Sequence, residues 1–186
     1  MDQNQNRYAF VEFSVGDSAS LERLSAVASE LQNQKVGDQV RDVEHWLPYF
    51  DEDGRASFWW ATEAQVESWN AFWFSTPLPE RHSPTMPTPG WDFGSMIDAI
   101  MDGEYDIIGV RQVDHVRGRF EFDPHAYPYG GIDAIRAIVR AFGHQIIRFD
   151  DGTGPIDGDP QPPRWIEGMK PLEARKPPFW DRFKPK

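Results

Sequence analysis

The sequence predicts an α+β fold, and three observations carry this prediction. Apolar residues alternate along residues 7–15 and again along 116–122, as they do in strands that pack one face on a core. Each of these segments precedes a segment with apolar residues at helical spacing. The chain has 186 residues, which is enough for a sizeable core without disulfides or metals. We therefore expect a sheet covered by helices.

The N-terminal segment predicts a strand followed by a helix. Residues 7–15 carry apolar side chains on both faces, which is typical of an inner strand. Asp17 or Ser18 can cap the helix that follows, and that helix ends near Gly37. Its apolar stripe consists of Leu21, Leu24, Val27, Ala28 and Leu31.

An aromatic-rich insertion occupies about 38–104. Within it, residues 57–61 are predicted to form a strand, and Thr62 with Gln65 forms a capping box that begins a helix. Residues 75–90 form a long loop punctuated by prolines, which is too long for a simple connection. The aromatic residues of the insertion are Trp46, Tyr49, Phe50, Phe58, Trp59, Trp60, Trp69, Phe72, Trp73, Phe74, Trp91 and Phe93.

The remaining elements follow in a regular order. Residues 92–102 are predicted as a short helix and 105–113 as a strand that turns into the strand 116–122. A helix within 131–142 and a strand at 146–149 complete the unit. With the insertion set aside, the order is βαββαβ, that of a ferredoxin-like sandwich, in which an antiparallel sheet carries helices on one face.

The charge of the chain is unevenly distributed. We expect a single α+β domain over residues 1–154, followed by a proline-rich linker and a basic, aromatic C-terminal arm over 155–186. The net charge is −11, but residues 164–186 contain seven basic and three acidic residues, which leaves −15 on residues 1–163. Such a body repels nucleic acid and favours a basic protein partner, although acidic surfaces also serve solubility alone.

Several classes of protein are disfavoured by what the sequence lacks. Without cysteine there is no disulfide scaffold and no thiolate catalysis. No apolar run approaches the roughly 18 residues of a membrane span, and the first residues are polar, so a cytoplasmic protein without membrane contact is expected. The five histidines show no metal-binding spacing and no phosphate-binding loop is present, so neither a metal nor a cofactor is predicted.

The loop after the strand 116–122 contains the one candidate for catalysis. Asp123 and His125 can do acid and base chemistry there, because an imidazole titrates near neutral pH. Alternatively, these two side chains hydrogen-bond the loop backbone while Tyr127 and Tyr129 pack on the next helix. No third catalytic group is identifiable, so an enzyme is the less favoured hypothesis.

The tryptophans are the candidates for binding. Trp59, Trp60, Trp69 and Trp73, together with Tyr127 and Tyr129, are predicted to contact a partner, because tryptophan and tyrosine are enriched at binding hot spots. Packing between the insertion and the sheet explains the rings equally well. Neighbouring residues of a strand point to opposite faces, so Trp59 and Trp60 would require cover on both.

The favoured function is therefore recognition of a protein. The sequence predicts an acidic, tryptophan-rich binding domain, and an inhibitor or immunity-type protein that neutralises a basic toxin or nuclease is one form of it. A small hydrolase- or transferase-like enzyme that uses residues 123–129, with His125 as acid or base, is one alternative. An accessory subunit that docks through its C-terminal arm is another.

Overall fold

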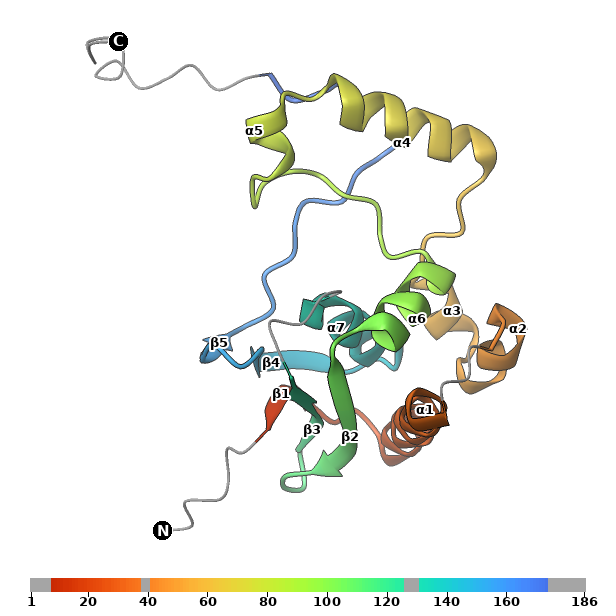
Figure 1. The fold of residues 1–186 in the computed structure, drawn as a ribbon, viewed down its shortest axis with the longest axis vertical. Coiled ribbons are helices and arrows are strands. Elements are labelled where there is room, and N and C mark those ends of the chain that lie inside the picture. The colour runs from red at the N-terminus through yellow and green to blue at the C-terminus, as the bar shows by residue number, and fades with distance from the viewer. Residues whose placement is uncertain (1–7, 38–40, 126–130, 174–186) are drawn as a thin grey trace, which may run out of the picture. The chain divides into compact units, whose positions relative to one another are not determined.

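The computed structural model shows a mixed α+β architecture (Figure 1). It describes residues 8–37, 41–125 and 131–173. Within these ranges, no helix has both the length and the apolar composition that a membrane crossing requires.

The chain forms two compact units. Unit 1 comprises Met1–Trp60 and Trp91–Pro160, and unit 2 comprises Ala61–Gly90 and Gln161–Lys186. The aromatic insertion is thus shared between the two units. Each unit is described separately below.

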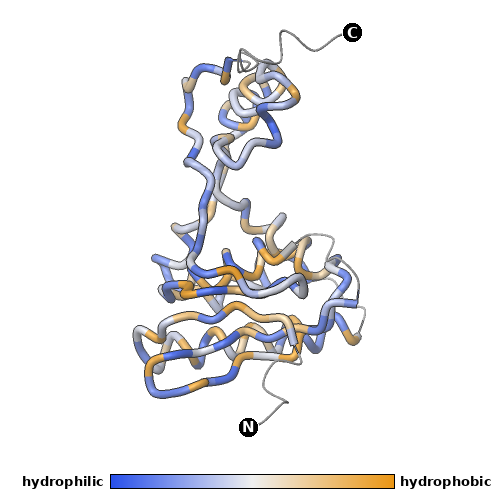
Figure 2. Tube along the Cα trace, turned by 90° about the vertical axis from the view of Figure 1, so that its left-hand side faces the viewer, coloured by the Kyte–Doolittle hydropathy of each residue, from blue (hydrophilic) through white to orange (hydrophobic). Residues whose placement is uncertain are grey.

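Unit 1 is built on a five-stranded sheet in the order β2-β3-β1-β4-β5, in which every neighbouring pair is antiparallel. The strands are β1 (Ala9–Ser14), β2 (Tyr105–Gln112), β3 (Arg117–Pro124), β4 (Gln145–Asp150) and β5 (Pro155–Asp157). Hydrophobic and hydrophilic residues are interspersed along the tube in Figure 2. The predicted α+β class and the antiparallel sheet are confirmed.

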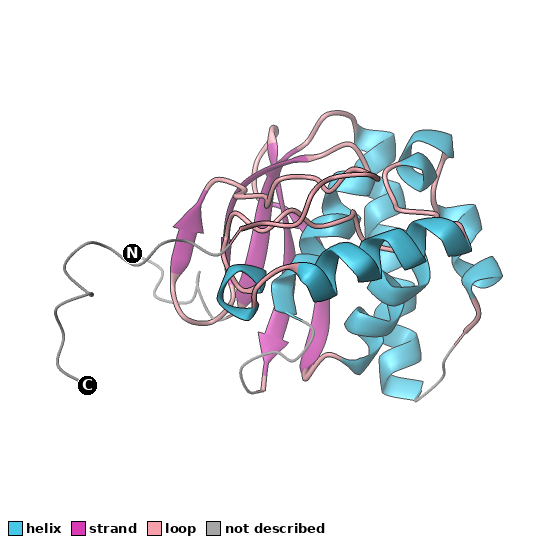
Figure 3. Ribbon diagram, turned by 90° about the horizontal axis from the view of Figure 1, so that it is seen from above, coloured by secondary structure: helices cyan, strands magenta, loops and turns pink. Residues whose placement is uncertain are grey.

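The helices of unit 1 pack against one face of this sheet (Figure 3). They are α1 (Ser18–Gly37), α2 (Val43–Trp46), the 3₁₀ helix η1 (Leu47–Tyr49), α3 (Glu52–Ala56), α6 (Phe93–Asp102) and α7 (Gly131–Ala141). Val11 and Phe13 of β1 belong to the hydrophobic core that these helices cover, whereas Glu12 between them points to the other face. That other face carries the charged residues Glu12, Arg119 and Arg148, with the Phe10 ring buried beneath Arg119, and is called the polar face below.

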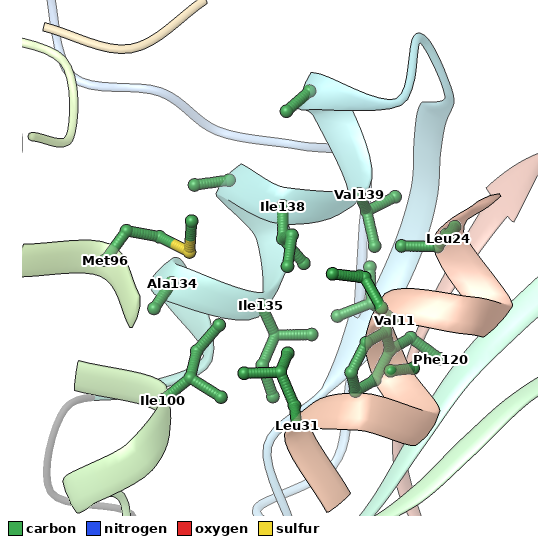
Figure 4. Close-up of a cluster of buried hydrophobic side chains, with 14 of the residues drawn as sticks. Val11, Leu24, Leu31, Met96, Ile100, Phe120, Ala134, Ile135, Ile138 and Val139 are labelled. Carbon is green, nitrogen blue, oxygen red and sulfur yellow. The ribbon is translucent and has the colours of Figure 1, made fainter. Parts of the chain in front are cut away.

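The core is centred on α7 (Figure 4). Ile135 and Ile138 are fully buried there, against Leu31 of α1, Ile100 of α6 and Phe120 of β3. Burial of each such side chain contributes roughly 1.5–3 kcal/mol. The expected crossover of β3, α7 and β4 is therefore present, and it supplies much of the core.

Polar caps hold the helices at the predicted places. The Asp17 carboxylate accepts a hydrogen bond from the Ser20 backbone N–H at 2.8 Å, at the start of α1. Lys35, at the other end of α1, donates from Nζ to the carbonyl oxygens of Ile100, Met101 and Gly103 at 2.8–2.9 Å. This lysine therefore satisfies the C-terminal carbonyls of α6, which have no partner within their own helix.

The strand predicted at residues 57–61 is wrong. Ser57 ends α3, and the residues after it form no strand. The Trp59 backbone N–H instead donates to the Trp91 carbonyl oxygen at 2.8 Å. This contact joins residues more than 30 positions apart, so local periodicity could not reveal it.

The segment predicted as a linker begins as a strand. Residues 155–157 form β5, which pairs with β4 at the sheet edge. Just beyond it, the Asp159 carboxylate accepts hydrogen bonds from Arg136 Nε at 2.9 Å and Arg140 Nε at 2.6 Å. These two arginines of α7 tie the segment to unit 1.

Unit 2 is a small helical unit. It contains α4 (Glu63–Ser75) and α5 (Leu78–Arg81), and the capping box of Thr62 and Gln65 at the start of α4 is confirmed. Trp165 is buried, with its ring centroid 5.6 Å from that of Trp69 and 6.3 Å from that of Phe72. Aromatic packing on one side of α4 thus holds the C-terminal segment in this unit.

Candidate functional site

The polar face of the sheet carries the most buried carboxylate in unit 1. Glu12 is 1% exposed, and its Oε2 accepts a hydrogen bond from Arg119 Nε at 2.6 Å. Arg148 and Arg117 lie 3.2 Å and 3.4 Å from Oε1 of the same carboxylate. The register explains this cluster, because β1 lies between β3 and β4 and places Glu12 opposite Arg119 and Arg148.

The charges of this cluster compensate one another. Burial alone would raise the pKa of Glu12, but the hydrogen bonds and charges of Arg119 and Arg148 lower it below the usual range. The guanidinium of Arg119 also lies 4.0 Å from the centroid of the Phe10 ring. Arg117 is shared with Asp114, at 2.7 Å. The cluster covers the sheet, and its arginines are already paired.

The catalytic candidates lie at the other end of the same sheet. Asp123 of β3 is in register with Asp106 of β2, and His125 Nε2 lies 2.9 Å from Asp106 Oδ2. Both members of the His125–Asp106 pair are largely exposed. Asp106, rather than the predicted Asp123, is thus the carboxylate that His125 contacts. Tyr127 and Tyr129 lie outside the described residues.

The four candidate tryptophans do not form a single cluster, since they divide between the two units. Trp59 and Trp60 belong to unit 1, and Trp69 and Trp73 belong to unit 2. Trp69 and Trp73 are half-buried and contact each other, with ring centroids 5.7 Å apart. Other aromatic residues of the insertion fill the core of unit 1, namely Trp46, Phe50, Phe58 and Phe93.

Trp60 is the exposed member of the four, at 49%. One face of its indole stacks on Phe93, with ring centroids 5.5 Å apart and planes within 16°. The indole Nε1 donates to the Arg55 carbonyl oxygen at 2.8 Å. The ring is therefore held between α3 and the start of α6, and its orientation is fixed.

Exposed carboxylates lie on the helix against which Trp60 packs. Glu52 and Asp53 form the first turn of α3, and neither makes an ion pair with another described residue. We refer to Trp60, Glu52 and Asp53 as the Trp60 surface. An exposed indole attracts an ammonium or guanidinium group through the ring quadrupole, and carboxylates on the same helix attract it through charge.

The chain was compared with protein-family models, curated proteins and solved structures. No protein-family model, curated protein or solved structure matches the chain. The function has to be inferred from the geometry.

Unit 1 carries most of the negative charge of the chain. By sequence, unit 1 has 24 acidic and 11 basic residues, or −13, whereas unit 2 has six and eight. Most arginines of unit 1 are held in ion pairs, at Glu12, Asp51, Glu121 and Asp159 among others. Several carboxylates on the helices have no such pair with a described residue: Glu44, Glu52, Asp53 and Asp98. The uncompensated charge therefore includes the helical side.

Among the described residues, no group of three or more histidine, aspartate or glutamate side chains is arranged to hold a metal ion.

Two exposed apolar residues of unit 2 were not singled out by the sequence analysis as binding residues. Phe74 and Leu78 are 70% and 63% exposed. The exposure of Phe74 could have been found from helical spacing once the faces of α4 were known, whereas Leu78 lies beyond the end of that helix.

Proposed function

We propose that the protein is an acidic binding domain for a basic protein partner, and that the Trp60 surface is one place where the partner docks. The observation that carries this proposal is a half-exposed indole held in a fixed orientation against α3, a helix whose first turn carries two exposed carboxylates without ion pairs to described residues. A fixed ring loses little conformational freedom on binding, which favours affinity.

The unequal charge of the units supports a basic partner. A net charge of −13 on unit 1 accelerates the approach of a cationic protein and repels acidic ones. An inhibitor or immunity-type protein that neutralises a basic toxin or nuclease requires these properties. Lysine and arginine side chains of the partner would then contact Trp60 and α3.

We also infer that the sheet is a variant of the ferredoxin-like βαββαβ type. The first four strands follow the order β4-β1-β3-β2, with antiparallel neighbours throughout, and α1 and α7 are the two crossover helices. Strand β5, beyond β4, and helices α2, α3 and α6, between α1 and β2, are additions to that scheme. The fold by itself implies no function.

Binding of a fluorescent nona-arginine peptide to the full chain tests the Trp60 surface, with a nona-glutamate peptide as the control ligand. Because a cation–π contact contributes about 0.5–2 kcal/mol, Trp60→Ala should weaken binding by roughly two- to thirtyfold. The double variant Glu52→Gln/Asp53→Gln should weaken it further at low salt. A matched double variant on α6, Asp98→Asn/Asp102→Asn, changes the charge equally at exposed positions and should have a smaller effect.

A pull-down extends the test to natural partners. The wild-type chain and Trp60→Ala are used as bait at about 50 mM and about 1 M salt, since charge attraction is screened within about 3 Å at the higher value. A basic protein should be retained by the wild-type chain at low salt and lost both with Trp60→Ala and at high salt. Equal retention by both baits at both salt concentrations would contradict the proposal.

A second candidate function is acid–base catalysis at the His125–Asp106 pair. The distance of 2.9 Å between His125 Nε2 and Asp106 Oδ2 favours it, because a carboxylate orients an imidazole for proton transfer. A screen of hydrolase and transferase substrates decides the matter, with His125→Ala and Asp106→Asn as controls. Activity that survives both changes would exclude this pair from the reaction.

A further inference from the structure

Helix α4 has two contrasting faces. Trp69 and Phe72 pack on Trp165 inside unit 2, whereas Val66, Asn70 and Phe74 follow one another at four-residue spacing on the exposed side. Residues with this spacing lie along one stripe of a helix. Leu78 is also exposed, but it begins α5 beyond the extended residues Thr76 and Pro77 and does not continue this spacing. We call Val66, Asn70 and Phe74 the α4 stripe.

Arg81 holds the end of α4. Its Nη2 donates to the Phe74 carbonyl oxygen at 2.8 Å, and its Nε donates to the Thr76 carbonyl oxygen at 2.7 Å. The guanidinium carbon lies 5.8 Å from the centroids of both the Trp73 and the Phe74 rings. These contacts fix the turn between α4 and α5, next to the exposed Phe74 ring.

The stripe is bordered by negative charge. Glu63 and Glu67 lie in the first half of α4, are exposed, and form no ion pair with another described residue. By helical spacing, both lie on the same side of α4 as Asn70, because Glu63 precedes Glu67 by four residues and Glu67 precedes Asn70 by three. An apolar stripe with carboxylates beside it complements an apolar stripe with lysine or arginine beside it.

We propose that the α4 stripe docks a basic amphipathic helix of the partner. This inference rests on the proposed function, since it concerns the same basic partner, but it names a different surface and the shape of what binds there. Two helices can pack along stripes of four-residue spacing, with Val66 and Phe74 as the apolar anchors. An added strand would need an unpaired backbone edge, which a hydrogen-bonded helix does not offer.

The test uses two 18-residue helical peptides, one of leucine and lysine and one of leucine and glutamate, in the same amphipathic pattern. Binding to the full chain is measured by fluorescence anisotropy. The leucine–lysine peptide should bind, and Phe74→Ser should weaken it by about tenfold or more, as expected for a hot-spot residue. Glu63→Gln/Glu67→Gln should weaken it by a factor of two or more at low salt, and this effect should vanish at high salt.

Unit 2 offers close controls for both changes. Ile166 is 67% exposed, in the same range as Phe74 and Leu78, but it lies outside α4, so Ile166→Ser should change the affinity by less than a factor of two. Glu167→Gln and Glu173→Gln remove exposed carboxylates of the same unit and should also have little effect. Circular dichroism of each variant confirms that the fold is retained.

Three outcomes would overturn the inference. The leucine–glutamate peptide could bind equally well, Ile166→Ser could weaken binding as much as Phe74→Ser, or the leucine–lysine peptide could bind only a chain that ends at Glu173. The last result would make the chain's own C-terminal residues the occupant. If the helical-peptide test fails while Trp60→Ala still weakens nona-arginine binding, only the proposal for the α4 stripe is refuted. If Trp60→Ala does not weaken nona-arginine binding, the proposed function is refuted.

Discussion

The substitution Glu12→Gln should destabilise unit 1 more than any other single exchange of a charged side chain on the polar sheet face. Glu12 is 1% exposed and Arg119 9%, and their 2.6 Å contact is the most buried ion pair on that face. Glutamine keeps the size of the side chain but removes the negative charge that pairs with Arg119 and Arg148, the two arginines that hold the pKa of Glu12 low. Arg119 is then left as a buried cation without a counter-charge.

The expected loss in the free energy of unfolding follows from how deeply each ion pair of Glu12 is buried. Removing one partner of a buried ion pair costs about 3–5 kcal/mol, because the remaining charge stays desolvated. The contacts of Arg148 and Arg117 with Glu12 are partly exposed, and pairs of that kind contribute about 0–1 kcal/mol each. We expect Glu12→Gln to lower the free energy of unfolding by about 3 kcal/mol and Arg148→Gln by about 1 kcal/mol or less.

Urea denaturation followed by far-UV circular dichroism measures these free energies. Glu121→Gln is the matched control. Glu121 lies two residues after Arg119 on the same face of β3, and it pairs with the exposed Arg111 at 2.8 Å. The control should lose about 0–1 kcal/mol. If Glu12→Gln lowers the free energy of unfolding no more than the control does, Arg119 does not depend on the Glu12 carboxylate for its counter-charge. That explanation for the stability of this face is then wrong.

Three further predictions concern other parts of the chain. Lys35→Met should cost about 1.5–3 kcal/mol in urea denaturation, because it deletes three charge-assisted hydrogen bonds at the end of α6. Burial lowers the pKa of His144, so as the pH falls the unfolded chain binds a proton at a higher pH than the folded chain does. The free energy of unfolding should therefore decrease as the pH drops below about 6.5, and His144→Phe should reduce this dependence on pH. Trp165→Ala removes a buried ring next to Trp69, so limited proteolysis within residues 61–90 should increase while unit 1 stays resistant; unchanged cleavage would show that unit 2 does not depend on this ring.

Most of unit 1 could be predicted from the sequence because its signals are local. The alternating residues of β1 and β3 and the helical spacing in α1 and α7 each fall within a short window, and the structure confirms these elements. Residues 57–61 were wrongly predicted as a strand because aromatic residues are enriched in strands. The hydrogen bond from the Trp59 backbone N–H to the Trp91 carbonyl oxygen involves a distant segment, which the local pattern does not reveal. Strand β5 has three residues and exists through its pairing with β4.

The candidate site was less predictable because exposure is a property of the assembled fold. The sequence indicates that tryptophans gather in the insertion, but it does not distinguish Trp46, which is buried, from Trp60, which is not. The Glu12 cluster had a usable signal. Glu12 alternates with the core residues of β1 as Arg119 does in β3, so the expected strand order would have placed them side by side.

The negative charge of unit 1 has a simpler explanation than partner binding, namely solubility, and the structure offers a way to separate the two. A charge that serves solubility acts through its total, so any two exposed carboxylates are equivalent. A charge that serves binding acts through its position, so Glu52 and Asp53 on α3, the helix that Trp60 contacts, should matter more than Asp98 and Asp102 on α6. An exposed indole does not improve solubility, yet Trp60 is held in place by a stacked ring and a hydrogen bond. A single exposed aromatic ring is common on protein surfaces, so the comparison of the two pairs of carboxylates, rather than the ring alone, separates binding from solubility.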